Sequence, residues 1–220
     1  STKSLNTFEG TDKITLSWVL SLDKGKGLQT NPKTMIYILP TDTCYGIACA
    51  FDDKKNYEKI YKIKKRSHDK PLAIMVKNFQ WLRENSDLTD EQVDFLERYE
   101  KPFTVLTHSR NIELFLEFAD DNEDYFINKD VYNQIAFRVA HNGMQESLIN
   151  EVGPIWLTSA NLSGAGETYD IAKIDSDFEY YIEKWIVEVM GTANLDPEVP
   201  ASDIFSFEGD SLEVNYLRKA

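Results

Sequence analysis

Three short apolar runs constrain the fold of this chain most. They cover residues 35–39, 45–51 and 72–76, and Pro40 closes the first of them. Continuous apolar runs of this length are typical of strands that are buried on both faces of a sheet. A segment with helical spacing separates the second run from the third. Strands that alternate with helices predict an α/β sheet with crossover connections.

The rest of the chain continues this alternation. We predict further strands at residues 103–107, 135–140, 155–158, 185–189, 203–207 and 212–217. We predict helices at residues 11–22, 79–82, 91–99 and 144–150, the third of them after a Thr89-Asp90 cap. The acidic stretch at 117–130 is most simply a solvated loop, and a divalent-metal role for it is the less favoured alternative.

Length and charge limit the function classes. With 220 residues and 42% hydrophobic content, we expect one domain covering residues 1–220, although two small domains also fit this length. The net charge of −13 argues against an extended nucleic-acid or anionic-membrane surface. The sequence contains no run of about 18 apolar residues and no signal-peptide pattern at its start, so we expect a cytoplasmic location.

One segment reverses the acidic balance of the chain. Residues 51–77 carry nine Lys and Arg against four Asp and Glu, a local balance of +5, and the remaining residues carry 15 against 33, or −18. Such a local reversal favours an anion-binding site.

A lysine completes the apolar face of the basic helix. Tyr57, Ile60 and Tyr61 share one helical face, and the next position on it is Lys64. An ammonium on the core side must find an anion or extend past the helix end. If the helix stops near Lys64, Lys64 and Arg66 could form a two-pronged clamp for phosphate or carboxylate. A cap that complements the helix dipole is the alternative.

Two other segments place polar groups next to predicted strands. The run Thr158–Gly164, TSANLSG, concentrates hydroxyl and amide groups at a strand end. It is either a capped turn or a polar lip at the edge where open α/β sheets bind ligands. Arg138 shares a strand face with Ala136 and Ala140, which leave room for a ligand or a paired acid.

The cysteines and histidines do not predict a metal site. Cys44 and Cys49 lie five residues apart, and the three histidines share no ligand spacing with them. We expect two reduced, partly buried thiols and no protein-bound metal.

Several motifs together carry a resemblance to a known family. They are PTDTCYG from Pro40 to Gly46, Lys64-Lys65-Arg66, Lys70-Pro71-Leu72, Pro102-Phe103-Thr104, Ala136-Phe137-Arg138-Val139 and TSANLSG from Thr158 to Gly164. In this order and spacing, over about residues 34–207, the chain resembles the YrdC-like family, whose TsaC-type members are threonylcarbamoyl-AMP synthases. Because the chain ends at Ala220, shortly after the matched segment, it resembles the short, single-domain form.

The resemblance implies both a fold and a reaction. The fold is a twisted, mixed and largely parallel open α/β sheet whose flanking helices enclose a concave basic cavity. The reaction condenses L-threonine, bicarbonate and ATP to threonylcarbamoyl-AMP and pyrophosphate, for the N6-threonylcarbamoyl modification of adenosine-37 in tRNA. Mg²⁺ enters with the ATP phosphates. The partners implied are tRNA threonylcarbamoyl transferase proteins, with at most weak contact to tRNA and no membrane.

The resemblance also assigns roles to residues. The catalytic positions it implies are Lys64, Arg66, Ser159 and Asn161. The substrate-binding positions it implies are Thr41, Thr43, Tyr45, Thr104, Arg138, Thr158 and Ser202. Met75 stands where some members carry a histidine, and Glu100-Lys101 replaces the usual Pro-Gly. The alternatives are a divergent paralogue, a carbamoyl-transfer module without synthase activity, and an RNA-binding domain.

Overall fold

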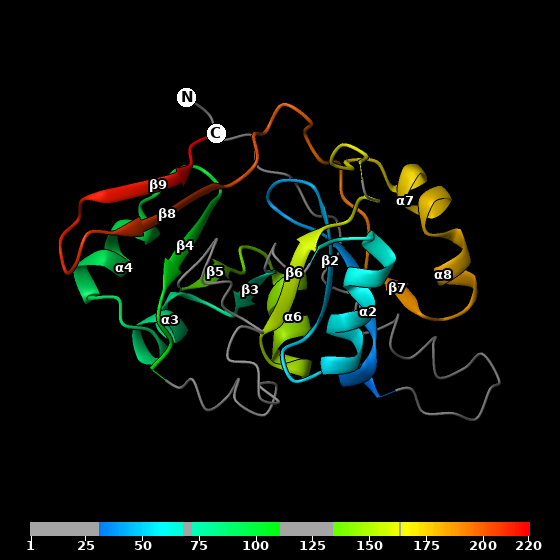
Figure 1. Ribbon diagram of the computed structural model, residues 1–220, viewed down its shortest axis with the longest axis horizontal. Helices are drawn as coiled ribbons and strands as arrows, with labels where there is room; N and C mark the ends of the chain where they lie inside the picture. Colours follow the sequence, from blue (N-terminus) through cyan, green and yellow to red (C-terminus); the bar gives the residue numbers. More distant parts are fainter. Residues whose placement is uncertain (1–30, 68–71, 111–133, 163) are drawn as a thin grey trace.

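The strands of the computed structural model form one sheet. The structure describes residues 31–67, 72–110, 134–162 and 164–220, and in this part of the chain nine strands pair in the order β7-β1-β2-β6-β3-β5-β4-β8-β9 (Figure 1). The strands are β1 Ile36–Pro40, β2 Tyr45–Ala50, β3 Ala73–Val76, β4 Phe103–Thr107, β5 Ile135–Val139, β6 Ile155–Ser159, β7 Val187–Val189, β8 Asp203–Phe207 and β9 Val214–Arg218. A mixed α/β architecture is confirmed.

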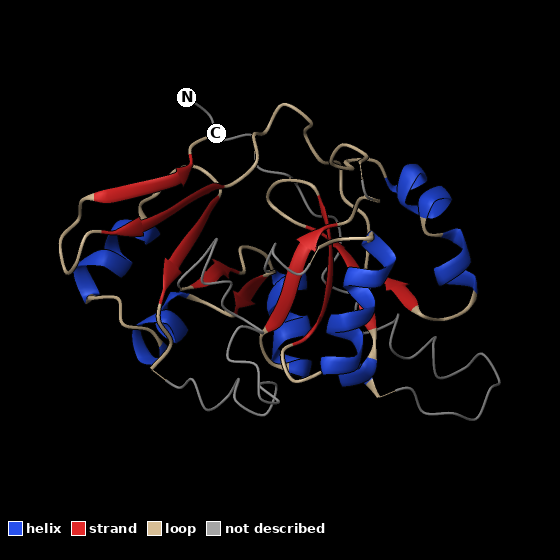
Figure 2. Cartoon of the chain, viewed as in Figure 1, coloured by secondary structure: helices blue, strands red, loops and turns tan. Residues whose placement is uncertain are grey.

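Helices flank this sheet (Figure 2). They are the 3-10 turn η1 Pro32–Thr34 and the α-helices α2 Lys54–Lys64, α3 Phe79–Asn85, α4 Asp90–Glu97, α6 Gly143–Val152, α7 Ile171–Asp177 and α8 Glu179–Glu183. The predicted Thr89 cap is confirmed, because its hydroxyl accepts from the Gln92 amide and the Gln92 side chain accepts from the Thr89 amide. None of the helices in the described ranges is long and apolar enough to cross a membrane.

The predicted strands are all present, with ends that shift by up to two residues. The predicted helix at 11–22 and the acidic stretch at 117–130 lie outside the described residues. Sequence reasoning missed α7 and α8. Ile174 is the one buried side chain in α7, and α8 has none, so neither helix shows the apolar stripe that identifies a helix in a sequence.

The expectation of a largely parallel sheet is wrong. Of the eight strand pairs in the described residues, five are antiparallel and three are parallel. The short turn of residues 41–44 joins β1 to β2, and a turn of that length permits only antiparallel pairing. Strand β6 lies between β2 and β3 and is antiparallel to both.

The first face of the sheet carries the larger core. Alternate residues of β1 and β2, such as Ile36, Ile38 and Ile47, join a cluster with side chains of α2, α3 and α4. Helix α2 contributes Tyr57, Ile60 and Tyr61, as the sequence predicted. Since both faces of these strands are buried, their apolar runs are continuous rather than alternating.

The second face is covered differently. Tyr37, Leu39, Ala48 and Met75 form a smaller cluster with side chains of α6. Farther along the same face the strands carry small or polar residues in place of large apolar ones. These smaller side chains leave space on the second face.

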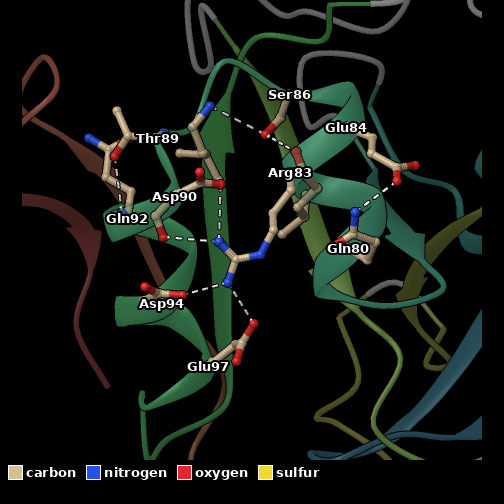
Figure 3. A network of polar contacts seen from close by, with 11 residues as sticks. Gln80, Arg83, Glu84, Ser86, Thr89, Asp90, Gln92, Asp94 and Glu97 are labelled. Carbon is tan, nitrogen blue, oxygen red and sulfur yellow. Dashed lines mark hydrogen bonds and ion pairs between the residues drawn. The ribbon is translucent and has the colours of Figure 1, made fainter.

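Helices α3 and α4 are joined by the Arg83 network (Figure 3). The guanidinium of Arg83 contacts Asp90 at 3.2 Å, Asp94 at 2.5 Å and Glu97 at 2.9 Å. These carboxylates raise the pKa of Arg83, Asp94 having the largest effect. A single surface ion pair contributes little, whereas three acids around one guanidinium form a network that fixes the two helices relative to each other. The network uses none of the residues that line the pocket described below.

Candidate ligand-binding site

An open pocket lies on the second face of the sheet. Its volume is about 180 Å³, far more than the roughly 10–15 Å³ that one water requires by the same measure. The pocket is lined by Thr41, Thr43, Cys44, Gly46, Arg66, Ala73, Thr104, Ala136, Arg138, Leu157, Thr158, Ser159, Glu167, Ala201, Ser202, Ile204 and Arg218. Small residues such as Gly46, Ala73 and Ala136 account for the empty space, because larger side chains at these positions would fill it.

Charged side chains in the pocket wall are mostly cationic. Within the described ranges, the charged residues that line it are Arg66, Arg138 and Arg218 and one acid, Glu167. Arginines suit planar carboxylate and phosphate groups, so the wall favours an anionic ligand. The expectation that the sheet and its flanking helices enclose a concave basic cavity stays a prediction.

The turn between β1 and β2 brings two predicted residues into the pocket. The Thr41 hydroxyl donates to the Cys44 carbonyl at 2.6 Å and accepts from the Thr43 amide at 3.1 Å. The two threonine hydroxyls lie 3.1 Å apart, and both residues are buried. These bonds hold the hydroxyls in one geometry before any ligand arrives.

Lys64 is buried below the pocket and does not line it. Its side chain is the last of α2, and Nζ donates to the Ser159 and Asn161 carbonyls, the latter at 3.1 Å. Nζ also donates to Asn161 Oδ1 at 3.0 Å and lies 3.5 Å from Ser159 Oγ. The lysine therefore joins the end of α2 to the polar lip after β6.

The end of α2 separates Lys64 from Arg66. Lys65 adopts a left-handed conformation with φ of 49°, and the Arg66 amide donates to the Tyr61 carbonyl at 2.9 Å. The chain then turns Arg66 toward the pocket while Lys64 stays beneath it. The helix stop is confirmed. Arg66 lines the pocket, whereas Lys64 bonds to the lip rather than capping its own helix. A clamp in which both residues act on one ligand anion stays a prediction.

The buried ammonium of Lys64 carries an electrostatic cost. No carboxylate among the described residues forms an ion pair with Nζ, and Lys64 is only 4% exposed. Burial, with a smaller contribution from the charge of Arg66, lowers the pKa of Lys64 to about 8. An anion bound near this group would offset that cost.

The polar lip is internally bonded. Ser159 Oγ donates to Asn161 Oδ1 at 2.5 Å, and Asn161 Nδ2 donates to the Ala165 carbonyl at 2.7 Å. Ser159 and Thr158 line the pocket, whereas Asn161 reaches it only through its bonds to Ser159 and Lys64. The lip is both a set of local backbone contacts and a pocket wall, so the two interpretations of this segment are compatible.

The opposite wall contains two further predicted residues and one that was missed. Thr104 and Ser202 lie in the pocket with their hydroxyls 3.0 Å apart. Arg218 donates from Nε to the Ser202 carbonyl at 2.8 Å and from Nη2 to the Ser202 hydroxyl at 3.0 Å. Sequence reasoning missed Arg218 and also Glu167. A cation at the end of a predicted strand was the available signal for Arg218, and the loop around Glu167 offered none.

Tyr45 is not in the pocket. It is fully buried on the first face, and its hydroxyl contacts the Ala193 backbone at 3.3 Å and 3.2 Å. Neighbouring residues of a strand point to opposite faces, so Gly46 lines the pocket in its place. The strand alternation could have excluded Tyr45 from the sequence alone.

We predict that Cys44→Ser retains most of the turnover, although Cys44 lines the pocket. Burial raises the pKa of the Cys44 thiol to about 11, with a smaller contribution from Glu167. Because the thiol is then protonated at neutral pH, it is a poor nucleophile. In the folded protein, alkylation by iodoacetamide should accelerate only as the pH approaches 11, whereas in urea it should accelerate near the usual thiol range of about 8.5. Loss of turnover in a folded Cys44→Ser protein would show that this prediction is wrong.

The described residues contain no cluster of three or more His, Cys, Asp or Glu side chains that could hold a metal ion. Among the residues that the structure describes, Glu167 is the only carboxylate in the pocket wall. The side chains of the pocket therefore suit the anions of a ligand better than a bare cation.

The described fold defines a class of α/β protein with an open pocket on one face of a mixed sheet. The family model Sua5_yciO_yrdC, described as "Telomere recombination", matches residues 33–196. The chain belongs to the Sua5/YciO/YrdC family. It is 28% identical over 168 residues to a protein of Pseudoalteromonas translucida named threonylcarbamoyl-AMP synthase, a match that covers 74% of this chain and 83% of that protein. A protein of the same name from Vibrio vulnificus is 26% identical over 167 residues, covering 73% and 83%.

Solved structures share the fold. P. abyssi Sua5 complexed with L-threonine has a TM-score of 0.66 and 19% identity, covering 86% of this chain and 51% of that one. E. coli YciO has a TM-score of 0.62 and 19% identity, covering 86% and 84%. HypF in its phosphate- and nucleotide-bound form has a TM-score of 0.64 and 18% identity, covering 86% and 27%. The chain thus spans about half of the Sua5 chain and most of YciO.

Proposed function

We propose that the chain is an L-threonylcarbamoyladenylate synthase, which condenses L-threonine, bicarbonate and ATP to threonylcarbamoyl-AMP and pyrophosphate. Family membership supports this, as do the two relatives named threonylcarbamoyl-AMP synthase, which are 26–28% identical over about three quarters of the chain. A relative's complex with L-threonine supports threonine as the amino-acid substrate. In reaction class the protein is then an ATP-dependent nucleotidyltransferase.

The observation that carries the proposal is the junction of Lys64 with the polar lip beside Arg66. Threonine carboxylate, carbamate and triphosphate are all anionic, so bringing them together requires fixed cations and oriented donors. Lys64 supplies a buried cation and Arg66 a second one in the pocket, and Ser159 supplies a pocket hydroxyl 3.5 Å from the lysine Nζ. This arrangement suits assembly of anions better than covalent catalysis.

The chemistry follows from that placement. The neutral threonine amine reacts with bicarbonate to form a carbamate, and water leaves with the bicarbonate hydroxyl and one amine proton. A carbamate oxygen then attacks the α-phosphate of ATP as pyrophosphate leaves. Arg66 and Lys64 stabilise the negative charge that develops around the phosphate, and the Thr41 and Thr43 hydroxyls orient the threonine end. Arg138, Thr104, Thr158 and Ser202 complete the substrate contacts. No covalent bond to the protein is needed.

Mg²⁺ fits this scheme as a companion of ATP. With three arginines and one acid in the wall, the pocket offers too few carboxylates to hold the ion by itself. Bound to the phosphates, Mg²⁺ would neutralise charge on the leaving pyrophosphate. The product would pass to tRNA threonylcarbamoyl transferase proteins in the cytoplasm.

We predict that the purified chain, given ATP, Mg²⁺, bicarbonate and L-threonine, forms threonylcarbamoyl-AMP detectable by mass spectrometry. Pyrophosphate release should require both threonine and bicarbonate. Omitting each substrate in turn provides the control. Equal release without threonine would contradict the synthase proposal.

A carbamoyl-transfer module is the second candidate; the likeness to HypF in its phosphate- and nucleotide-bound form supports a shared fold for it. If that candidate is right, carbamoyl phosphate should support turnover in place of threonine and bicarbonate. The same mass-spectrometric assay separates the two, because only the synthase incorporates the mass of threonine.

A further inference from the structure

An ion pair joins the turn before β2 to the central strand β5. The Nη2 group of Arg138 contacts Oδ1 of Asp42, and their side chains are 12% and 28% exposed. Asp42 lies between Thr41 and Thr43, the two threonines of the pocket wall, and Arg138 lines the same pocket. Arg138 of this pair is thus in the pocket wall, and Asp42 adjoins the wall through its neighbours Thr41 and Thr43.

A buried glutamine fixes the backbones on both sides of this pair. Gln145 of α6 is fully buried, and its Nε2 donates to the Pro40 carbonyl at 3.1 Å. Its Oε1 accepts from the His141 amide at 3.0 Å. One side chain therefore connects the residue before the Thr41 turn with the segment after β5. Asp42 and Arg138 are held at a set separation by the backbone, so their contact does not depend on the pair alone.

The contact uses only part of the guanidinium. Within the described residues, Asp42 is the sole hydrogen-bond or ion-pair partner of Arg138, and it meets Nη2. A guanidinium has two forked edges, Nε with Nη2 and Nη1 with Nη2, and Nη2 carries two hydrogens, so one acceptor on Nη2 leaves one edge for a second planar anion. A carboxylate at one edge fixes the plane of the guanidinium and leaves the other edge for a ligand.

We propose that Asp42 is a positioning residue, which holds the Arg138 guanidinium so that its free edge binds an anionic group of the substrate. The inference deepens the proposed function and rests on it for the identity of the substrates. The anionic group is either the carboxylate of the amino acid or a phosphate of the nucleotide, two oxygen anions that the same guanidinium edge can bind.

Asp42 has two other possible effects, and each makes a different prediction. A carboxylate that competed with the ligand for Arg138 would weaken binding, so its neutralisation would tighten binding. A purely structural pair would change the melting temperature and leave the binding constants of a folded variant unchanged. A positioning residue changes the KM of the substrate that Arg138 binds more than it changes kcat.

The test compares Asp42→Asn, Asp42→Glu and Arg138→Ala with the wild type in the full chain. Asp42→Asn keeps the size of the side chain and removes its charge, and it should raise one KM by roughly tenfold, the effect of a single charge-assisted contact. Asp42→Glu should recover part of the loss. In the Arg138→Ala background, Asp42→Asn should add little, because the two residues act through one contact. Asp87→Asn is the matched control. Asp87 forms an exposed ion pair with Arg110, in which Arg110 Nε and Asp87 Oδ1 lie 3.7 Å apart, and neither residue lines the pocket.

The outcomes are separable. A rise in the KM for threonine alone assigns the amino-acid carboxylate, a rise in the KM for ATP alone assigns a phosphate, and either supports the proposal. Unchanged KM values in folded Asp42→Asn, with or without a lower Tm, would overturn it, and so would a lower KM. Calorimetry with ATP and with L-threonine tests the inference separately from the proposed function. If the wild type binds these ligands without forming product, only the proposed function fails. The ratio of the Kd values of Asp42→Asn and the wild type then decides the inference. Binding of neither ligand by the wild type would overturn both.

Discussion

Replacing Lys64 by methionine should reduce kcat/KM by about 10²- to 10³-fold, which is the effect of removing one preorganised electrostatic group from an active site. Methionine fills a similar volume but brings no charge and no donors to the lip. The Lys64→Met substitution leaves the Asn161 carbonyl and Oδ1 without the lysine contact, which lowers the free energy of unfolding. It also removes a buried ammonium that has no carboxylate partner among the described residues, which restores stability. We therefore expect the melting temperature to change much less than the activity.

The same substitution at Lys62 is the matched control, because Lys62 lies on the exposed side of the same helix. Its activity and melting temperature should stay near those of the wild type. Threonylcarbamoyl-AMP formation and thermal unfolding, measured on both variants, check the prediction. Wild-type turnover in a folded Lys64→Met protein would show that the junction with the polar lip is only structural.

Arg66→Ala should weaken ligand binding by about 10- to 100-fold, the equivalent of roughly 1.5–3 kcal/mol for a charge-assisted contact. Arg66 lines the pocket and is a full charge that a bound phosphate or carboxylate would contact directly. Binding by the variant should also become less sensitive to salt, since one ion pair is lost. Calorimetric titration with ATP at two salt concentrations measures both effects.

Arg66→Lys separates the charge from its geometry. It keeps the cation and loses the planar fork, so an intermediate affinity is expected if the ligand is held bidentately. Normal binding and turnover by Arg66→Ala would mean that the ligand contacts lie elsewhere in the pocket.

Local features of the site could be predicted from the sequence. The position of Lys64 followed from helical periodicity, because i, i+3, i+4 and i+7 fall on one face wherever the helix lies. The polar lip followed from a strand end rich in short polar side chains. Tyr45 was misplaced because a motif was carried over as a block, without the alternation of strand residues that sends Tyr45 and Gly46 to opposite faces.

Non-local features could not be predicted in the same way. The small neighbours of Arg138 indicated a ligand or a paired acid, but the acid is Asp42, 96 residues earlier in the chain. The prediction of strand direction was wrong for a related reason. Apolar runs mark strands that are buried on both faces but do not encode their direction, and β6 is such a strand although it runs antiparallel to both of its neighbours. Arg218 reaches the pocket only because β9 pairs with β8, which no local pattern encodes.

The strand order has a consequence for how the protein reaches its active form. Residue pairs across the pocket join β2 with β6 and β4 with β8, pairings that bridge about a hundred residues of chain. Chain loops of that length must close before these contacts contribute any free energy, so folding that depends on them is slow. A partly synthesised chain that ends before β6 lacks one wall of the pocket and the acceptors for Lys64. Ligand binding can therefore begin only late in folding, and a ligand selects molecules in which the sheet is already complete.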